Sequence, residues 1–176
     1  MVGRPATAGR PFAAGDDAPR VGLGWDLHRL EAGRPFRLGG VTIPSEVGPV
    51  GHSDGDALLH ALIDAMLGAA GLGDIGERFP DTDPQWKDVA SDVFLRKTKE
   101  DLRSWSVVNA DLTVLAEEPK LGPYREKIRA RVAELLGVSM TRINLKAKTM
   151  EGLGPIGARE AIAVLAAVQM EEAPAK

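Results

Sequence analysis

The stretch Arg20-Val-Gly-Leu-Gly-Trp-Asp-Leu-His28 alternates large apolar residues with glycine, aspartate and histidine. Alternation with a period of two residues is typical of a β-strand, because successive side chains point to opposite faces of a sheet. We therefore predict a strand with one apolar face and one face that carries two glycines, Asp26 and His28. Asp26 and His28 lie about 7 Å apart along this face, at about 3.3 Å per residue, so both can converge on one ion.

A helix is predicted downstream, because Ser53-x-x-Asp56 has the spacing of an N-terminal capping box. The apolar residues that follow recur with helical periodicity as far as about Ala70. Gly71 comes next, and glycine is the residue type that best tolerates a left-handed helix end. The helix is therefore expected to run from Ser53 to about Ala70.

The three histidines of the chain, His28, His52 and His60, all lie within one third of its length. His60 belongs to a polar stripe of the predicted helix, with Asp56 and Asp64 at intervals of four residues. Either aspartate can orient the His60 ring as an outer hydrogen-bond partner, or can simply be a solvated helix charge.

Asp26, His28 and His60 form a candidate metal site. Two imidazoles and one carboxylate are three ligands of the kind that zinc prefers, and they leave the fourth tetrahedral position open, as in catalytic sites. The alternative is that both histidines are ordinary polar residues at a strand end and on a helix surface. The clustering of the histidines and the space left by the two strand glycines favour the metal site.

The segment Gly51-His52-Ser53 is predicted to bind an anion such as a phosphate. It lies where a loop meets the N-terminus of the predicted helix, and such an end offers unpaired N–H groups and a positive dipole. Ser53 can be the N-cap of that helix at the same time.

Strands and helices interleave in the remainder of the chain, which predicts an α+β fold with helices on one face of a sheet. Two short strands are expected around a Gly39–Gly40 turn within residues 36–43, and the long loop over 71–87 is expected to be functional or mobile. Further helices are predicted over 89–105 and 124–136, further strands over 107–115 and 142–148, and a final apolar helix over 159–171.

The composition excludes several classes of protein. The chain has 176 residues, no cysteine and a formal net charge of −3. Disulfide frameworks, thiol chemistry and metal sites with sulfur ligands are therefore excluded, and a general nucleic-acid binder, which needs a basic surface, is not expected. No apolar run reaches the roughly 18 residues needed to cross a bilayer, so no membrane association is expected either.

The ends of the chain are expected to be tails. Residues 1–19 are dominated by Gly, Ala, Pro and Arg, a composition typical of disorder. We predict a disordered tail over 1–19, one catalytic domain over 20–172 and a short C-terminal tail over 173–176. Because the sequence has no export signal and no cysteine, a cytoplasmic location is expected.

Longer motifs identify a family. They are Gly24-Trp-Asp-Leu-His28, Leu38-Gly-Gly-Val-Thr-Ile-Pro44, Gly51-His-Ser-Asp-Gly-Asp-Ala-Leu-Leu-His-Ala61, Gly68-Ala-Ala-Gly-Leu-Gly-Asp-Ile-Gly76, Phe79-Pro-Asp-Thr-Asp-Pro84, Asn109-x-Asp111, Pro119-Lys120 and Asn144-Leu-Lys-Ala147. In these motifs the chain resembles the 2-C-methyl-D-erythritol 2,4-cyclodiphosphate synthases, from about Arg20 to Val168.

The resemblance implies a ferredoxin-like α+β subunit with a mixed sheet and helices on one face, assembled as a homotrimer with active sites between neighbouring subunits. It also implies a phosphorus–oxygen lyase of the non-mevalonate isoprenoid pathway. That enzyme converts 4-diphosphocytidyl-2-C-methyl-D-erythritol 2-phosphate into the cyclic 2,4-diphosphate and CMP.

The resemblance assigns roles to metal-binding and catalytic residues. Asp26, His28 and His60 match the zinc ligands, in agreement with the ligand argument above. His52 and Thr149 match the positions that hold the β-phosphate and stabilise the transition state. Glu151 matches the carboxylate that holds a second divalent cation, magnesium or manganese, on the diphosphate.

Further positions match residues that bind substrate. Ser53 is expected at the phosphate, and Asp74, Ile75 and Gly76 at the erythritol hydroxyls. A mobile segment is expected from Phe79 through Asp81 to Asp83. The cytidine pocket is matched by Ala116, Pro119, Lys120, Gly122 and Lys148, although Lys120 can also be an ordinary solvated lysine.

The sequence departs from the family in two places. A threonine run of the family is replaced by Lys148-Thr149-Met150, so two of three hydroxyls are absent and the fit of the nucleotide can differ. In the family a Phe and an Arg line a central trimer cavity that takes isoprenoid diphosphates. Here those positions are Pro155 and Ala158, with Arg159 one place later, which leaves that ligand open.

Two other functions fit the same residues. A metallophosphatase would use the three ligands to activate water and would release inorganic phosphate instead of CMP. A trimeric small-ligand-binding protein would use them as a structural metal site, closed by a fourth ligand such as Asp56 or His52.

Overall fold

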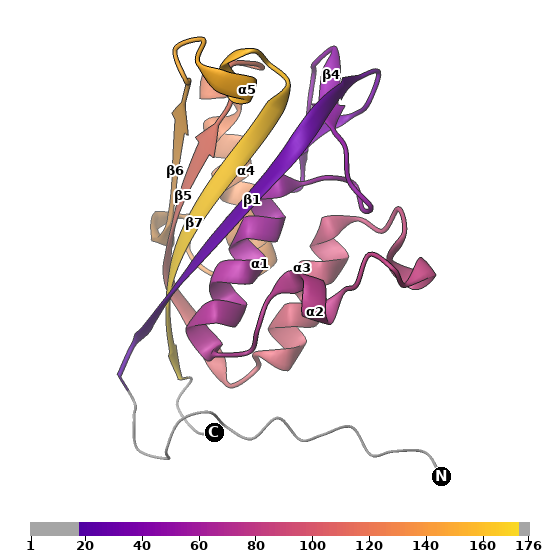
Figure 1. Ribbon diagram of the computed structural model, residues 1–176. Coiled ribbons are helices and arrows are strands. Elements are labelled where there is room, and N and C mark those ends of the chain that lie inside the picture. Colours follow the sequence, from indigo (N-terminus) through magenta and orange to yellow (C-terminus); the bar gives the residue numbers. More distant parts are fainter. Residues whose placement is uncertain (1–17, 173–176) are drawn as a thin grey trace.

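A five-stranded sheet in the order β4-β1-β7-β5-β6 organises the chain (Figure 1). A separate hairpin is formed by β2 and β3. The computed structural model describes residues 18–172. The strands are β1 (Arg20–Ala32), β2 (Phe36–Leu38), β3 (Val41–Ile43), β4 (Val47–Pro49), β5 (Trp105–Leu115), β6 (Ile143–Lys148) and β7 (Ala161–Glu172). The α-helices are α1 (Ala57–Ala70), α2 (Ile75–Arg78), α3 (Ser91–Asp101), α4 (Arg125–Leu136) and α5 (Gly154–Gly157), with 3-10 turns at Pro84–Trp86, Gly122–Tyr124 and Met140–Arg142.

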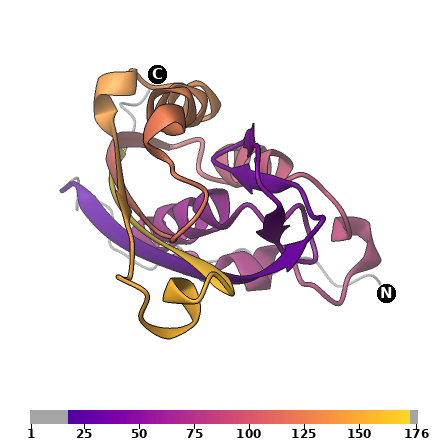
Figure 2. The same cartoon turned by 90° about the horizontal axis from the view of Figure 1, so that it is seen from above.

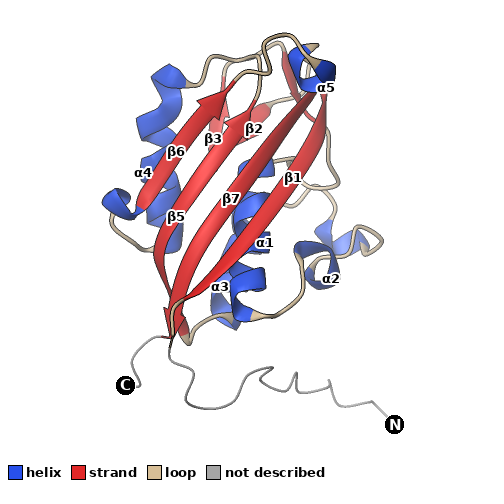
Figure 3. Cartoon of the chain, turned by 60° about the vertical axis from the view of Figure 1, so that its left-hand side comes forward, coloured by secondary structure: helices blue, strands red, loops and turns tan. Residues whose placement is uncertain are grey.

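The sheet is mixed. Strand β7 pairs antiparallel with both β1 and β5, whereas β5 and β6 are parallel. Helices α1, α3 and α4 cover one face, and the opposite face is open along β1, β7, β5 and β6 (Figures 2 and 3). The predicted α+β sheet with helices on one face is therefore confirmed.

Strand β1 packs on α1 through its glycine face. A Cβ atom on Gly22 would lie 1.8 Å from the carbonyl oxygen of Ala65, and one on Gly24 would lie 1.9 Å from that of Ala61. Only glycine allows so close an approach between a strand and a helix. The glycines therefore bring α1 within reach of the polar residues that follow them on the same face of β1.

The apolar face of β1 points away from α1. Leu23 is 77% exposed and Trp25 is 57% exposed, and Val21 and Leu27 are also exposed. Leu165 of the neighbouring strand β7 extends the same surface. The predicted two-faced strand is confirmed, and the core of the subunit lies on its glycine side.

The predicted C-terminal helix over 159–171 is wrong, because this segment forms the central strand β7. Each neighbour pairs with it over most of its length, from Arg20↔Met170 to Arg29↔Ala161 on one side and from Trp105↔Glu172 to Leu115↔Ala163 on the other. A central strand is apolar on both faces, so its sequence lacks the alternation that distinguishes a strand from a buried helix.

The start of the first helix is also corrected. Helix α1 begins at Ala57 and its N-cap is Asp56, whereas Ser53 lies in the preceding turn. The Asp56 carboxylate is fully buried and accepts hydrogen bonds from the backbone N–H groups of Leu59, Gly39 and Gly40. It thereby ties the β2–β3 turn to the helix, which is a tertiary role that a local capping pattern cannot indicate.

Most other elements agree with prediction to within a few residues. The hairpin of β2 and β3 around Gly39–Gly40 is confirmed, as are the helix end at Gly71 and the helix over Arg125–Leu136. The loop over 71–87 contains the short helix α2 and one 3-10 turn. Residues 1–17 and 173–176 of the predicted tails lie outside the described residues.

None of the helices in residues 18–172 has the length and apolar character needed to cross a membrane.

Candidate metal centre and active site

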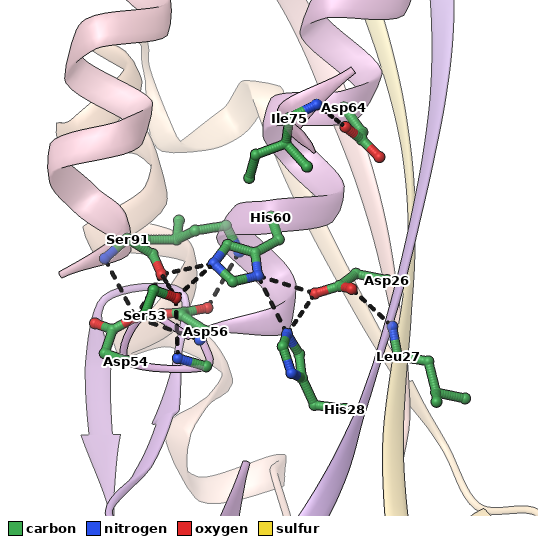
Figure 4. A network of polar contacts seen from close by, with 12 residues as sticks. Asp26, Leu27, His28, Ser53, Asp54, Asp56, His60, Asp64, Ile75 and Ser91 are labelled. Carbon is green, nitrogen blue, oxygen red and sulfur yellow. Dashed lines mark hydrogen bonds and ion pairs between the residues drawn. The ribbon is translucent and has the colours of Figure 1, made fainter. Parts of the chain in front are cut away.

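Three side chains from β1 and α1 meet in a triangle (Figure 4). The Asp26 Oδ2 atom lies 2.8 Å from His28 Nε2 and 3.0 Å from His60 Nδ1. The two imidazole nitrogens are 3.2 Å apart. Within residues 18–172, this is the one group of three or more potential ligands whose ligand atoms converge in this way.

The size of the triangle suits a tetrahedral metal ion. Zinc–nitrogen bonds of about 2.0–2.1 Å place neighbouring ligand atoms of a tetrahedron about 3.3–3.4 Å apart. The observed edges of 2.8–3.2 Å need to open by only a few tenths of an ångström. The sequence-based expectation that Asp26, His28 and His60 can hold a metal is therefore supported by geometry.

The proton positions on His28 also suit a metal ligand. Its Nδ1 lies 2.6 Å from the carbonyl oxygen of Val50, and a carbonyl can only accept, so Nδ1 is the donor. In the neutral ring the lone pair then lies on Nε2, which faces Asp26 and His60. Electron-rich atoms at this distance repel one another unless a proton or a metal cation lies between them.

The pKa values of Asp26 and His28 also indicate that a positive charge stabilises the triangle. Burial opposes the charge on Asp26, but hydrogen bonds from His28 and His60 outweigh it and hold the pKa of the carboxyl well below its usual range. Burial also opposes a charged His28, yet its hydrogen bond to Asp26 raises the pKa of this imidazole. Without a metal, the triangle therefore favours a proton shared with Asp26.

A cavity of about 460 Å³ opens onto the triangle. Predicted site residues that line it, apart from the triangle, are His52, Ser53, Ile75, Gly76, Phe79 and Asp81. Its wall is aromatic: the Phe79 and Phe94 rings stack at 4.6 Å, and Trp86 packs edge-on against both. Residues of the predicted metal, phosphate and loop sites thus share one cavity.

Three further residues of the site were not predicted from the sequence. Trp86 and Phe94 form part of the cavity wall, and the Ser91 hydroxyl lies 2.9 Å from His60 Nε2. Phe94 and Ser91 lie on α3, a helix that carries no recognisable motif. No local signal in the sequence indicates that α3 reaches the candidate metal ligands, since this contact depends on how helices pack.

Of the two roles considered for Asp56 and Asp64, a hydrogen bond that orients His60 is not found among the described residues. Asp56 is the buried N-cap described above, and the Asp64 carboxylate accepts a hydrogen bond of 2.8 Å from the backbone N–H of Ile75. Burial raises the pKa of Asp64. Asp64 therefore fixes the start of α2 beside the cavity, and the outer nitrogen of His60 is bound by Ser53 and Ser91 instead.

The reason given for an anion site at Gly51-His52-Ser53 is also wrong, because α1 starts only at Ala57. The segment nevertheless reaches the cavity, where His52 is exposed and Ser53 is buried. The backbone carbonyl of His52 accepts a hydrogen bond from Asp88 N–H at 2.8 Å, which ties this loop to the segment before α3.

Asp74 and Asp83 lie outside this lining and cap short helical turns. The Asp74 carboxylate accepts from the Glu77 N–H at 2.9 Å, and that of Asp83 accepts from the Gln85 N–H at 3.0 Å. Their carboxylates therefore have structural partners at both ends of the loop that contains Phe79 and Asp81.

The remaining predicted residues form a second group at the carboxyl ends of the parallel strands β5 and β6. They are Ala116, Pro119, Lys120, Gly122, Lys148, Thr149 and Glu151, and they lie outside the lining of the cavity. Glu117 organises the group, because its carboxylate accepts hydrogen bonds from the N–H groups of Met150 and Gly152. The Thr149 hydroxyl donates to Glu151 at 2.9 Å.

Glu151 and Arg159 both have left-handed backbones, with φ of 52° and 65°. Arg159 forms an ion pair of 3.1 Å with Glu118. Pro155 lies in the short helix α5, and Ala158 is its C-cap.

Comparisons with known proteins identify relatives along most of the chain. The YgbB family model matches residues 19–171. A protein of Desulfatibacillum aliphaticivorans named 2-C-methyl-D-erythritol 2,4-cyclodiphosphate synthase is 50% identical over 154 residues, which cover 86% of this chain and 99% of that protein. A solved synthase structure described as a CDP-bound form is 45% identical with a TM-score of 0.79, over 86% of this chain and all of the other. The bifunctional IspDF of Campylobacter jejuni gives a TM-score of 0.85 at 41% identity, over 89% of this chain and 43% of its own length.

Proposed function

The chain belongs to the YgbB family and has the 2-C-methyl-D-erythritol 2,4-cyclodiphosphate synthase role in isoprenoid biosynthesis. On this basis we propose that Asp26, His28 and His60 hold its catalytic metal. The single observation that carries the proposal is the triangle of ligand atoms, 2.8–3.2 Å on each edge, open to a cavity. One open coordination position on the cavity side matches a catalytic ion and not a structural one.

The enzyme is a lyase that cyclises 4-diphosphocytidyl-2-C-methyl-D-erythritol 2-phosphate and releases CMP. The 2-phosphate oxygen attacks the β-phosphorus in line as the CMP oxygen leaves. In such phosphoryl transfers the protein acts mainly by positioning and by stabilising charge. Zinc, when bound, supplies a Lewis acid that neutralises phosphate charge.

The residues of the cavity are proposed to position the two phosphates. His52 is exposed at the cavity, where its imidazole can reach a phosphate oxygen, and Ser53 lies deeper beside His60. Holding both reacting groups in one pocket replaces a bimolecular encounter and lowers the entropic barrier. The aromatic wall of Phe79, Trp86 and Phe94 is proposed to limit the access of water to this space.

The erythritol hydroxyls are proposed to bind at the start of α2, beside Gly76 and Asp74. The Ile75 N–H is already taken by Asp64, so the contribution of Ile75 is its side chain at the cavity wall. The segment from Phe79 to Asp83 is proposed to close over bound substrate.

A homotrimer is proposed because the predicted site residues fall into two groups on one chain. The resemblance places active sites between subunits, so the second group of one copy would complete the cavity of its neighbour. Ala116, Pro119, Lys120, Gly122 and Lys148 would then hold the cytidine, and Thr149 with Glu151 would hold the diphosphate with magnesium or manganese. The exposed apolar face of Val21, Leu23, Trp25, Leu27 and Leu165 supplies a surface for assembly.

The first test compares two imidazoles of the cavity. We expect His28→Ala to lose zinc, measured by elemental analysis after dialysis, and to lose CMP release by more than about a thousandfold. His52→Ala is expected to keep its zinc and still lose most of its turnover. CMP release by a zinc-free His28→Ala protein at the wild-type rate would contradict the metal assignment.

The same assay separates the alternatives. A metallophosphatase would release inorganic phosphate, and a binding protein with a structural metal would release neither product. With the synthase role supported by the relatives, no observation on the described residues favours either alternative.

A further inference from the structure

The outer nitrogen of His60 is bound by a partly buried chain of polar groups that ends at a carboxylate (Figure 4). His60 Nε2 lies 2.9 Å from the hydroxyl of Ser91, which is fully buried at the first position of α3. That hydroxyl donates to Asp54 Oδ1. The backbone N–H of Ser91 also donates to Asp54 Oδ1, at 3.2 Å.

The direction of these hydrogen bonds follows from the groups involved. A carboxylate can only accept, so the Ser91 proton points to Asp54. The Ser91 oxygen therefore accepts from the ring, and His60 carries its proton on Nε2. In the neutral ring the lone pair then lies on Nδ1, the atom that faces Asp26 and His28.

Asp54 is itself held in place. Its Oδ2 lies 3.6 Å from Arg37 Nε, which is buried and has no hydrogen-bond partner among the described residues, so the two charges balance. The N-cap of α3, Ala90, offers no capping side chain, and Asp54 takes over this function through the Ser91 N–H. One carboxylate thus fixes both the start of α3 and the hydroxyl that binds His60.

We propose that Ser91 and Asp54 are positioning residues that hold His60 in the tautomer with its proton on Nε2 and so present Nδ1 to the metal. The inference rests on the proposed metal site of Asp26, His28 and His60. Partners behind a metal-binding histidine fix its tautomer and ring orientation, and their loss typically weakens metal binding by about 10–100-fold. The opposite tautomer would point an N–H into the position of the ion.

The test measures the His60 tautomer and zinc affinity separately. Nitrogen-15 spectra of the metal-free protein at about pH 8.5, well above the ordinary histidine pKa, report which ring nitrogen is protonated. The chain has only three histidines, and His52→Gln removes one signal for assignment. Zinc dissociation constants come from competition with a chelator.

We expect wild-type His60 to be protonated on Nε2, and Ser91→Ala to show a mixture with Nδ1–H and about 10–100-fold weaker zinc binding. Ser53 Oγ lies 3.1 Å from the same nitrogen, so Ser53→Ala/Ser91→Ala should show a larger change than Ser91→Ala alone. Asp54→Ala should weaken zinc binding to a similar extent, and adding it to Ser91→Ala should cost little more, because both act through one chain.

Matched variants separate positioning from packing. Threonine and valine side chains have nearly the same shape, but only threonine keeps a hydroxyl. Ser91→Val should therefore lose zinc affinity, and Ser91→Thr should keep it. Thr98→Val removes another buried hydroxyl of α3, one without a hydrogen-bond partner among residues 18–172, and should leave both readouts unchanged.

The proposal is overturned if Ser91→Ala and Ser91→Val keep the wild-type tautomer and bind zinc within about threefold of the wild type. It is also overturned if the Thr and Val variants lose affinity equally. Failure of the wild-type protein to bind zinc would instead refute the metal site itself, and the tautomer of metal-free His60 would still decide whether Ser91 orients the ring.

Discussion

The two faces of β1 have opposite chemistry and opposite surroundings. The face toward α1 carries Gly22, Gly24, Asp26 and His28, and it is packed against the helix. The other face carries Val21, Leu23, Trp25 and Leu27, and it is exposed on the single chain. The face without large side chains lies inside the subunit, because its glycines allow α1 to approach the strand closely. In the proposed homotrimer the apolar face would form contacts between subunits.

The largest expected effect comes from filling the close contact. Gly24→Val introduces a Cβ that would lie only 1.9 Å from the Ala61 carbonyl oxygen, which is far inside van der Waals contact. We expect the free energy of unfolding to fall by more than about 3 kcal/mol, measured by thermal or denaturant unfolding. Gly122→Ala is the control, because a Cβ there meets nothing within 4 Å, and its stability should change by less than about 0.5 kcal/mol. Equal stability of the two variants would mean that α1 can move away from β1.

The next effect is on assembly through the opposite face. Trp25→Asp places a charge in the middle of the apolar surface. We therefore expect the mass in solution to fall from that of the proposed trimer to that of one chain, while circular dichroism stays unchanged. Thr42→Asp adds the same charge to an exposed residue of the β2–β3 hairpin and should leave the mass unchanged. If Trp25→Asp keeps the mass of the wild type, this face is not the subunit contact.

A smaller effect is expected from pH on the stability of the metal-free protein, through Asp26 and His28 on the face of β1 toward α1. The lowered pKa of Asp26 stabilises the fold above about its ordinary value of 3.8, and this contribution is lost as the pH falls through the lower folded pKa. The raised pKa of His28 stabilises the fold below its ordinary value of 6.5, and this contribution is lost as the pH rises through the higher folded pKa. Stability from this pair is therefore greatest between these two values.

Zinc should move that optimum to higher pH, because metal binding requires deprotonated ligands. Melting temperatures across pH, with and without zinc, measure this change. His28→Gln should remove the decline on the alkaline side. A decline that persists in this variant would assign it to other groups.

The smallest effect on stability is expected from an ion pair on the open face of the sheet. The Lys146 ammonium lies 2.7 Å from Asp111 and holds the pKa of that carboxyl below its usual range, but both side chains are more than a third exposed on the single chain. Lys146→Met should therefore cost less than about 0.5 kcal/mol in the Trp25→Asp monomer. A larger cost in the wild-type assembly than in the monomer would indicate that a neighbouring subunit covers this ion pair, and equal costs would indicate that it stays in contact with water.

Much of the site could be predicted from local patterns. The alternation from Val21 to His28 places Asp26 and His28 on one face of a strand, and the helical stripe places His60 on the polar side of a helix. Ligand chemistry then suggests a metal, and the 2.8–3.2 Å triangle agrees with that.

The incorrect predictions share one cause, which is that the deciding contact was distant in sequence. The sequence of β7 predicts a helix because its strand partners β1 and β5, which pair with its two edges, are distant in the chain. The sequence predicts that Asp56 belongs to a local helix cap. In the structure its carboxylate also accepts hydrogen bonds from the turn at Gly39 and Gly40. The outer nitrogen of His60 is bound by Ser53 and by Ser91 of α3, and not by an aspartate of its own helix.

The sequence by itself determined the family, the two-faced first strand and the three candidate metal ligands, because these depend on residue types and on spacing along one element. Tertiary structure decided that the glycine face is the inner one, that the C-terminal segment is the central strand and that Ser91 and Asp54 stand behind His60. Periodicity fixes the direction of a side chain within its own helix or strand. Which other element contacts that side chain depends on the packing of the whole chain, and local spacing does not indicate it.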